Sequence, residues 1–164
     1  MVCDVDLAIP KNVADHHHQA EWTLPVDSIL INVTPHMHVL GRSIQAVAYS
    51  PDGKEVPLIR IDDWDFYWQD SYTFEKLIEL PAGTRIVVDC HFDNSSANPQ
   101  NPNDPPQDVY WGDFSQDEMG ICYFQATTKT YDDYVTLNQR ANEYFNGQWQ
   151  QYQEDQKRRK AADQ

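Results

Sequence analysis

The segment "SILINVTPHMH", residues 28–38, is the stretch that decides the fold class. From residue 31 to residue 39, apolar side chains occupy the odd positions and polar side chains the even positions: Ile31, Val33, Pro35, Met37 and Val39 against Asn32, Thr34, His36 and His38. Successive side chains of a β-strand point to opposite faces. The alternation therefore predicts a half-buried strand, with Met37 in the core and His36 and His38 together on the outer face.

Further runs after this segment have the composition of short strands: residues 43–49, 55–61, 65–69, 72–80, 84–92, 108–112 and 119–128. Turn-forming sequences separate them, including "SPDGK" (50–54), "LPAGT" (80–84) and the Pro- and Asn-rich segment 93–107. Short strands at this spacing predict an all-β protein, an antiparallel jelly-roll β-sandwich.

The character of the chain changes at Thr130. Mostly apolar side chains then recur at steps of three and four residues: Tyr134, Leu137, Ala141, Phe145, Gln148 or Trp149, and Tyr152. This period predicts a C-terminal amphipathic helix, and we expect a sandwich domain over 1–128 and a helical extension over 129–164. The apolar stripe can pack on its own sandwich or dock a partner domain.

The charge balance excludes some classes of partner. The chain has 26 acidic and 12 basic residues, a net charge of −14, so most of its surface would repel nucleic acid and anionic membranes. The sequence contains no apolar run of about 18 residues, so it does not predict a membrane-spanning helix. The first residues lack a secretion-signal pattern, so we expect a cytosolic protein or a mature piece whose signal was removed.

Strand parity also relates the histidine pair to a methionine. In 84–92, Cys90 faces inward and His91 outward; in "DEMGICYF" (117–124), Met119 and Cys122 face opposite ways. If Cys90 and Cys122 meet in the core, Met119 emerges on the face that carries His36 and His38. Two imidazoles and a thioether favour copper, because soft sulfur suits Cu(I) while imidazole tolerates both oxidation states. The simpler alternative is a pair of exposed strand residues that bind no metal.

Two segments carry a family resemblance. "PHMHVLGRS" (35–43) and "DEMGICYF" (117–124) resemble the second, catalytic-copper domain of the type II copper, ascorbate-dependent monooxygenases, the group that includes peptidylglycine α-hydroxylating and dopamine β-monooxygenases, and above all its bacterial relatives. The resemblance covers roughly residues 9–125. It implies a jelly roll with one copper ion on an outward face, held by His36, His38 and Met119. It also implies that the copper activates dioxygen to hydroxylate a C–H bond of an organic substrate, with ascorbate supplying electrons.

The sequence departs from the family in two respects. Gly120 stands where animal members have a cysteine, so the resemblance implies a Cys90–Cys122 disulfide instead, and with it an oxidising, periplasmic or extracellular location. The family also uses a preceding electron-transfer copper domain, which the first 27 residues could not form. We therefore expect either an incomplete enzyme that needs a redox domain or subunit, or a non-catalytic copper-binding or assembly module.

Other residues support weaker hypotheses. His91 is a candidate for the shell behind the copper ligands or for a substrate contact, and His16, His17 and His18 for a second metal site or an ordinary strand edge. Asp117 and Glu118 can orient imidazoles or cap a turn. Aromatic residues near position 66 can line a substrate groove or the core: Trp64, Phe66, Tyr67 and Trp68.

Overall fold

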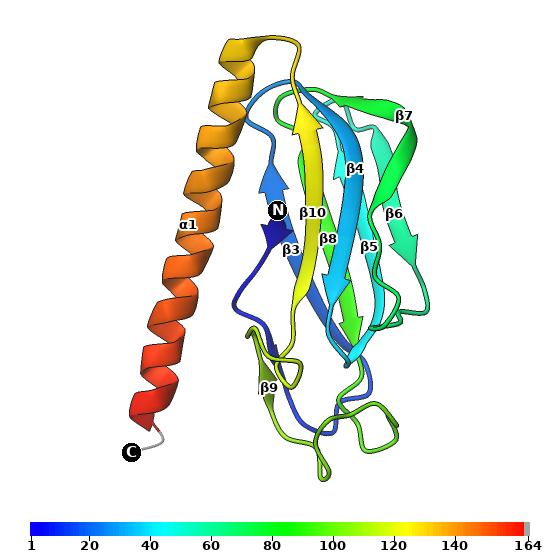
Figure 1. Ribbon diagram of the computed structural model, residues 1–164, viewed down its shortest axis with the longest axis vertical. Helices are drawn as coiled ribbons and strands as arrows, with labels where there is room; N and C mark the ends of the chain where they lie inside the picture. The colour runs from blue at the N-terminus through cyan, green and yellow to red at the C-terminus, as the bar shows by residue number, and fades with distance from the viewer. Residues whose placement is uncertain (163–164) are drawn as a thin grey trace.

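The computed structural model describes residues 1–162 as ten β-strands followed by one α-helix. The elements are β1 (Val2–Cys3), β2 (Ala8–Ile9), β3 (His16–Thr23), β4 (Ser28–Met37), β5 (Gly41–Tyr49), β6 (Glu55–Ile61), β7 (Tyr72–Leu80), β8 (Arg85–Phe92), β9 (Val109–Tyr110), β10 (Gly120–Thr127) and α1 (Tyr131–Ala162). Two antiparallel four-stranded sheets have the orders β1-β10-β4-β7 and β3-β8-β5-β6, and β2 pairs with β9. Figure 1 shows the two sheets as layers with α1 beside them. The predicted all-β sandwich with a terminal helix is confirmed.

The core lies between the two sheets and follows the predicted alternation. Val33 and Met37 of β4 are fully buried, as are Val88 and Phe92 of β8. The prediction fails at Ile31, which is only partly buried. The pairing of β4 with β7 shifts register between Leu30 and Asn32, so a bulge interrupts the two-residue period there.

Several strand assignments differ from the sequence prediction, which also did not include the two-residue strands β1 and β2. Residues 65–69 form a turn, in which the Asp65 carboxylate accepts a hydrogen bond from the Tyr67 amide at 2.8 Å. Only β9 forms within 108–112. Strand β3 was not predicted, because its start "HHHQ" has no apolar alternation; it is an edge strand that pairs with β8 alone.

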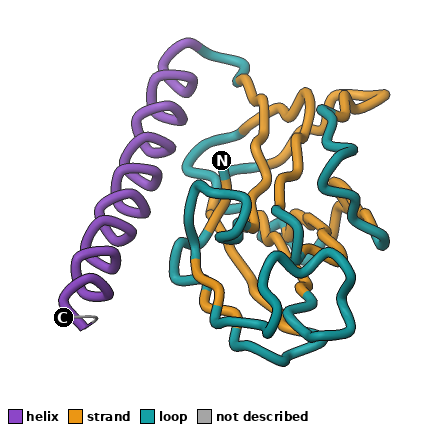
Figure 2. Tube along the Cα trace, turned by 60° about the horizontal axis from the view of Figure 1, so that its bottom comes forward, coloured by secondary structure: helices purple, strands orange, loops and turns teal. Residues whose placement is uncertain are grey.

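Helix α1 packs on its own sandwich, along the side where the edge strands β1 and β3 lie (Figure 1, and the turned view of Figure 2). Leu137 is buried, and the rings of Tyr144 and Trp22 lie 6.0 Å apart. The Tyr144 hydroxyl bonds to the backbone of Cys3, and Gln148 accepts the Val5 amide at 3.0 Å. Among residues 1–162, no helix has the length and apolar character needed to span a membrane.

All three cysteines are buried free thiols, so the expected Cys90–Cys122 disulfide is wrong for this structure. The residue facing Cys90 across the sandwich is Gly120: a Cβ added there would lie 2.8 Å from the Cys90 sulfur and 3.4 Å from its Cβ. Cys122 lies two positions further along β10. The expectation of an oxidising location therefore has no disulfide to support it.

Candidate metal centre

His36 and His38 lie side by side at the end of β4. Their ring centroids are 5.1 Å apart and the rings are nearly perpendicular, at 82°. His38 is 5% exposed and His36 is partly buried. The site therefore lies on the outer face of the β1-β10-β4-β7 sheet but is sheltered from water.

Each of the two rings is held by a hydrogen bond at its Nδ1 atom. His36 Nδ1 lies 2.6 Å from Gln69 Oε1, and His38 Nδ1 lies 3.0 Å from the carbonyl oxygen of Asp117. The Gln69 amide is itself oriented, since its Nε2 donates to the Phe66 carbonyl at 2.8 Å. Carbonyl oxygens only accept hydrogen bonds, so each Nδ1 carries the proton and each Nε2 keeps its lone pair. The two Nε2 atoms are therefore the nitrogens available to a metal.

The protonation of His36 favours the same chemistry. Burial lowers the pKa of His36, the hydrogen bond that His36 donates to Gln69 raises it, and the neighbouring His38 lowers it. A neutral imidazole is the form that binds metals. His36 thus stays in this neutral form at a lower pH than an exposed histidine would.

Met119 lies on the same face as the histidine pair. In the β4–β10 ladder, Gly120 pairs with Met37 and Ile121 with His36. Continuing this register by one step would place Met119 opposite His38. Met119 is partly buried, and its thioether is the one soft donor among the three predicted ligands.

A buried carboxylate fastens the two segments together. The Glu118 side chain, 0% exposed, accepts hydrogen bonds from the backbone amides of His38, Leu40 (2.9 Å) and Met119 (2.8 Å). Burial raises the pKa of Glu118 to about 8, and the three amide donors oppose that rise. Sequence reasoning allowed Glu118 an orienting or capping role. The structure gives it a wider one, because it joins the segment of the two histidines to that of Met119.

Of the four aromatic residues near position 66, two contact His38 and two lie at the surface. Trp64 is buried and its Nε1 donates to the His38 carbonyl at 3.2 Å. The Phe66 ring packs edge-on against His38, with centroids 6.0 Å apart. Tyr67 and Trp68 are 86% and 73% exposed. They therefore do not line a formed groove.

His91 lies elsewhere. It is on the outer face of β8, in the other sheet, where it pairs with His17 of β3 and bonds to Asp15 at 2.7 Å. The outer faces of a two-sheet sandwich point in opposite directions. His91 is therefore not in the shell behind His36 and His38, the first of the two roles expected for it.

The triplet His16, His17 and His18 does not converge on one point. Strand alternation sends His17 outward, whereas His18 approaches the Asp4 carbonyl at 3.3 Å and the His16 ring lies 6.4 Å from Phe92. Within residues 1–162, no three His, Cys, Asp or Glu side chains gather in a metal-binding arrangement. The three-histidine site is therefore not formed.

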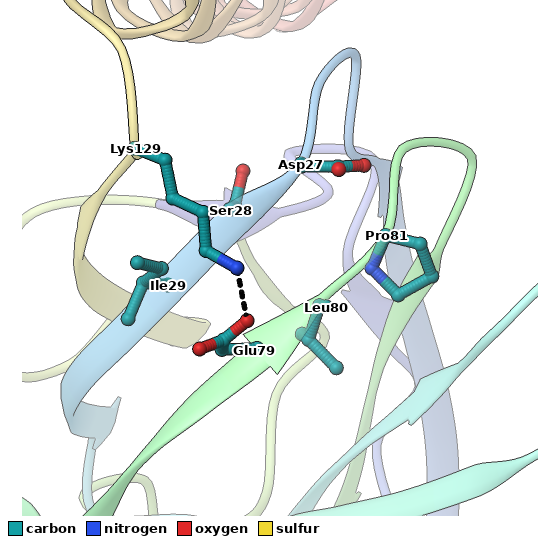
Figure 3. Close-up of a pocket in the computed structure, with 7 residues that line it drawn as sticks. All are labelled: Asp27, Ser28, Ile29, Glu79, Leu80, Pro81 and Lys129. Carbon is teal, nitrogen blue, oxygen red and sulfur yellow. Dashed lines mark hydrogen bonds and ion pairs between the residues drawn. The ribbon is translucent and has the colours of Figure 1, made fainter.

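A hollow at the other end of β4 offers less chemistry. It has a volume of about 210 Å³ and is lined by Asp27, Ser28, Ile29, Glu79, Leu80, Pro81 and Lys129. Figure 3 shows Lys129 reaching across it to Glu79, and the two groups form an ion pair of 2.6 Å. Its charged pair is already satisfied, so the histidine face remains the candidate site.

Two oriented imidazoles beside a thioether, on one face of a β-sandwich, define a domain suited to a soft or borderline metal ion. Comparison with known families is more specific. Residues 12–147 match the family described as copper type II ascorbate-dependent monooxygenase, C-terminal domain, and the chain belongs to that family. The resemblance in the two anchor segments is thereby confirmed. The match continues past residue 128 into α1, and the domain division at 128/129 stays a prediction.

A curated relative agrees with this assignment. The chain is 30% identical over 57 residues to human DBH-like monooxygenase protein 2. The aligned part is 35% of this chain and 11% of the human protein. The chain thus corresponds to a small part of that relative's length.

Proposed function

We propose that this domain binds one copper ion through Nε2 of His36, Nε2 of His38 and the sulfur of Met119. We propose that it serves the hydroxylation of an organic substrate. The reaction combines a substrate C–H bond, dioxygen, two electrons and two protons into an alcohol and one water molecule. An ascorbate-type reductant supplies the electrons. The observation that carries the proposal is that both Nδ1 atoms are hydrogen-bonded, which leaves both Nε2 atoms as donors.

The spacing of the rings supports copper binding. A metal about 2.0–2.1 Å from one nitrogen of each of two imidazoles holds the ring centroids roughly 5 Å apart when the angle at the metal is near tetrahedral. The centroids of His36 and His38 are 5.1 Å apart. The donor set, two imidazoles and a thioether, suits both Cu(I) and Cu(II). When bound, copper would supply one-electron redox chemistry and a coordination position open to a small molecule.

The residues around the ligands have separate tasks in this proposal. Gln69 and the Asp117 carbonyl fix the imidazole orientations, and Glu118 sets the distance between the His38 and Met119 backbones. Phe66 excludes water from one side of His38. The exposed Tyr67 is a candidate contact for substrate or for the domain that delivers electrons, which we propose is a separate redox domain or subunit.

The test is the Cu(I) affinity and copper content of the protein under ascorbate without oxygen. We expect one copper per chain bound at the centre, and its loss in the His36→Ala, His38→Ala double variant. Met119→Leu should weaken Cu(I) more than Cu(II), because only the soft thioether is removed. Met37→Leu is the matched control, since Met37 is fully buried in the core and should leave the affinity unchanged. Equal Cu(I) binding by the double variant and the wild type would refute the proposal.

A further inference from the structure

A second pair of imidazoles lies on the opposite face of the sandwich. His17 of β3 and His91 of β8 are direct cross-strand partners. Their ring centroids are 4.9 Å apart, with an angle of 35° between the planes. Both side chains reach solvent, at 51% and 40% exposure. The pair is therefore accessible to a dissolved ion.

Each of these rings is held by a carboxylate. His17 Nε2 lies 2.8 Å from Asp89 Oδ1, and His91 Nδ1 lies 2.7 Å from Asp15 Oδ1. Ionised carboxylates only accept hydrogen bonds, so these two nitrogens carry protons in the neutral rings. The lone pairs are left on Nδ1 of His17 and Nε2 of His91. A carboxylate behind each imidazole is the usual support of a metal-binding histidine.

The support on the β8 side is itself fixed. Asp89 also accepts hydrogen bonds from Gln19 Nε2 at 2.8 Å and from Gln45 Nε2 at 3.4 Å. Its side chain is only 15% exposed. Side chains of the two neighbouring strands, β3 and β5, thus hold the carboxylate that orients His17. The orientation of His17 is therefore fixed by a hydrogen-bond network.

We propose that His17 and His91 form a second metal site, which binds a divalent late transition-metal ion through two imidazoles and completes its coordination with water. The 4.9 Å separation of the centroids matches the roughly 5 Å expected for two imidazoles on one ion. Cu(II) binds most tightly of the divalent first-row ions, and Zn(II) more weakly. Asp15 and Asp89 act from the outer shell, because they bond to the ring nitrogens that face away from the ion.

The surroundings leave room for water and favour a cation. An open polar hollow of about 320 Å³ adjoins His91, lined by Ala14, Asp15, Arg42, Ser43, Asp62 and His91. Both arginines near it are paired, Arg42 with Asp93 at 3.2 Å and Arg60 with Asp62 at 2.7 Å. Asp15 and Asp89 therefore add negative charge beside the imidazole pair. Since His36 and His38 lie on the other sheet, the two sites are independent.

The test uses the full chain without a histidine tag, in the His36→Ala, His38→Ala background that removes the first site. We titrate Cu(II) by calorimetry and record its electron paramagnetic resonance spectrum. We expect one ion with nitrogen ligands, and a loss of affinity of at least about tenfold when either His17 or His91 is changed to alanine. His16→Ala is the matched control, because His16 is on the same strand with its ring toward Phe92.

Asp15→Asn provides a second variant that keeps both imidazoles. Loss of an outer-shell partner should weaken binding by about 10–100-fold without removing the ion. Binding that is absent from the parent variant, or that survives both His17→Ala and His91→Ala, overturns the proposal. Circular dichroism of each variant separates a loss of metal from a loss of fold.

Discussion

The two outward faces of this sandwich each carry a pair of imidazoles at nearly the same separation, 5.1 Å on one face and 4.9 Å on the other. The difference lies in what holds them. On the β4 face the partners are an amide and a backbone carbonyl, and His38 is buried. On the β8 face the partners are two carboxylates, and both rings are exposed.

This comparison shows two ways of orienting the same chemical group. A ring anchored to backbone and surrounded by core side chains depends on the fold, so its geometry and the stability of the protein change together. A ring anchored by surface carboxylates depends on side chains alone, and can be altered without cost to the core. In the proposed sites only the β4 face includes a thioether, that of Met119, so we expect the β4 face to favour softer metal ions than the β8 face.

The largest effect should follow from Glu118→Ala. It leaves the buried amides of His38, Leu40 and Met119 without an acceptor, and we expect a loss of about 3–5 kcal/mol in the free energy of unfolding. Urea denaturation of the metal-free protein measures it. Asp117→Asn is the control, since the Asp117 side chain accepts only the Phe114 amide at 3.3 Å. A loss below 1 kcal/mol would contradict the fastening role of Glu118.

Gly120→Cys should stabilise the protein. A Cβ at position 120 would lie 3.4 Å from the Cβ of Cys90, close to the range of disulfides. Closing a loop of about 30 residues contributes roughly 3–4 kcal/mol in the chain-entropy model. The gain should appear in thermal unfolding and vanish with reductant. Gly120→Ala is the control: it adds the Cβ without the sulfur and should destabilise by about 1–3 kcal/mol through crowding against Cys90.

Much of the β4 face could be predicted from the sequence, because it follows from local periodicity. The two-residue period placed Met37 inside, as the structure shows, and predicted that His36, His38 and Met119 share the other face; it did not predict that His38 is buried there. The supports could not be read in this way. Gln69 lies in a turn that was mistaken for a strand, and the role of Asp117 is carried by its carbonyl oxygen, which every residue has.

The β8 face was harder, because its geometry depends on which strands become neighbours. Parity correctly made His91 face outward, but it cannot say which of the two sheets contains a strand. His17 is one of three consecutive histidines, and only the register with β8 shows that it is the one that pairs with His91. The disulfide was misassigned for a related reason: parity puts Gly120 and Cys122 on the same face, and only the sheet-to-sheet alignment shows that Gly120 faces Cys90.

Gln69→Leu should have a smaller effect, confined to metal binding on the β4 face. The Nδ1 proton of His36 loses its acceptor, so the ring is less well oriented, and we expect Cu(I) affinity to fall about 10–100-fold, or roughly 1.4–2.7 kcal/mol. A competition titration with a chromophoric Cu(I) chelator measures it. Ser71→Ala is the control in the same segment, because the Ser71 hydroxyl contacts Thr34 at 2.9 Å and neither ring. An equal loss in both variants would mean that the loop as a whole, and not Gln69, orients His36.

The smallest effect should come from His17→Ala in the absence of metal. Its ring is 51% exposed and its hydrogen bond to Asp89 is one of three that the carboxylate accepts. We therefore expect the free energy of unfolding to change by no more than about 0.5 kcal/mol. His36→Ala, measured beside it by urea denaturation, should cost about 1 kcal/mol or more, because Gln69 then loses its partner at a partly buried site. If His17→Ala costs as much as His36→Ala, the β8 pair contributes to the stability of the fold as much as the β4 pair does, and the contrast between a sheltered pair and an exposed, carboxylate-held pair fails.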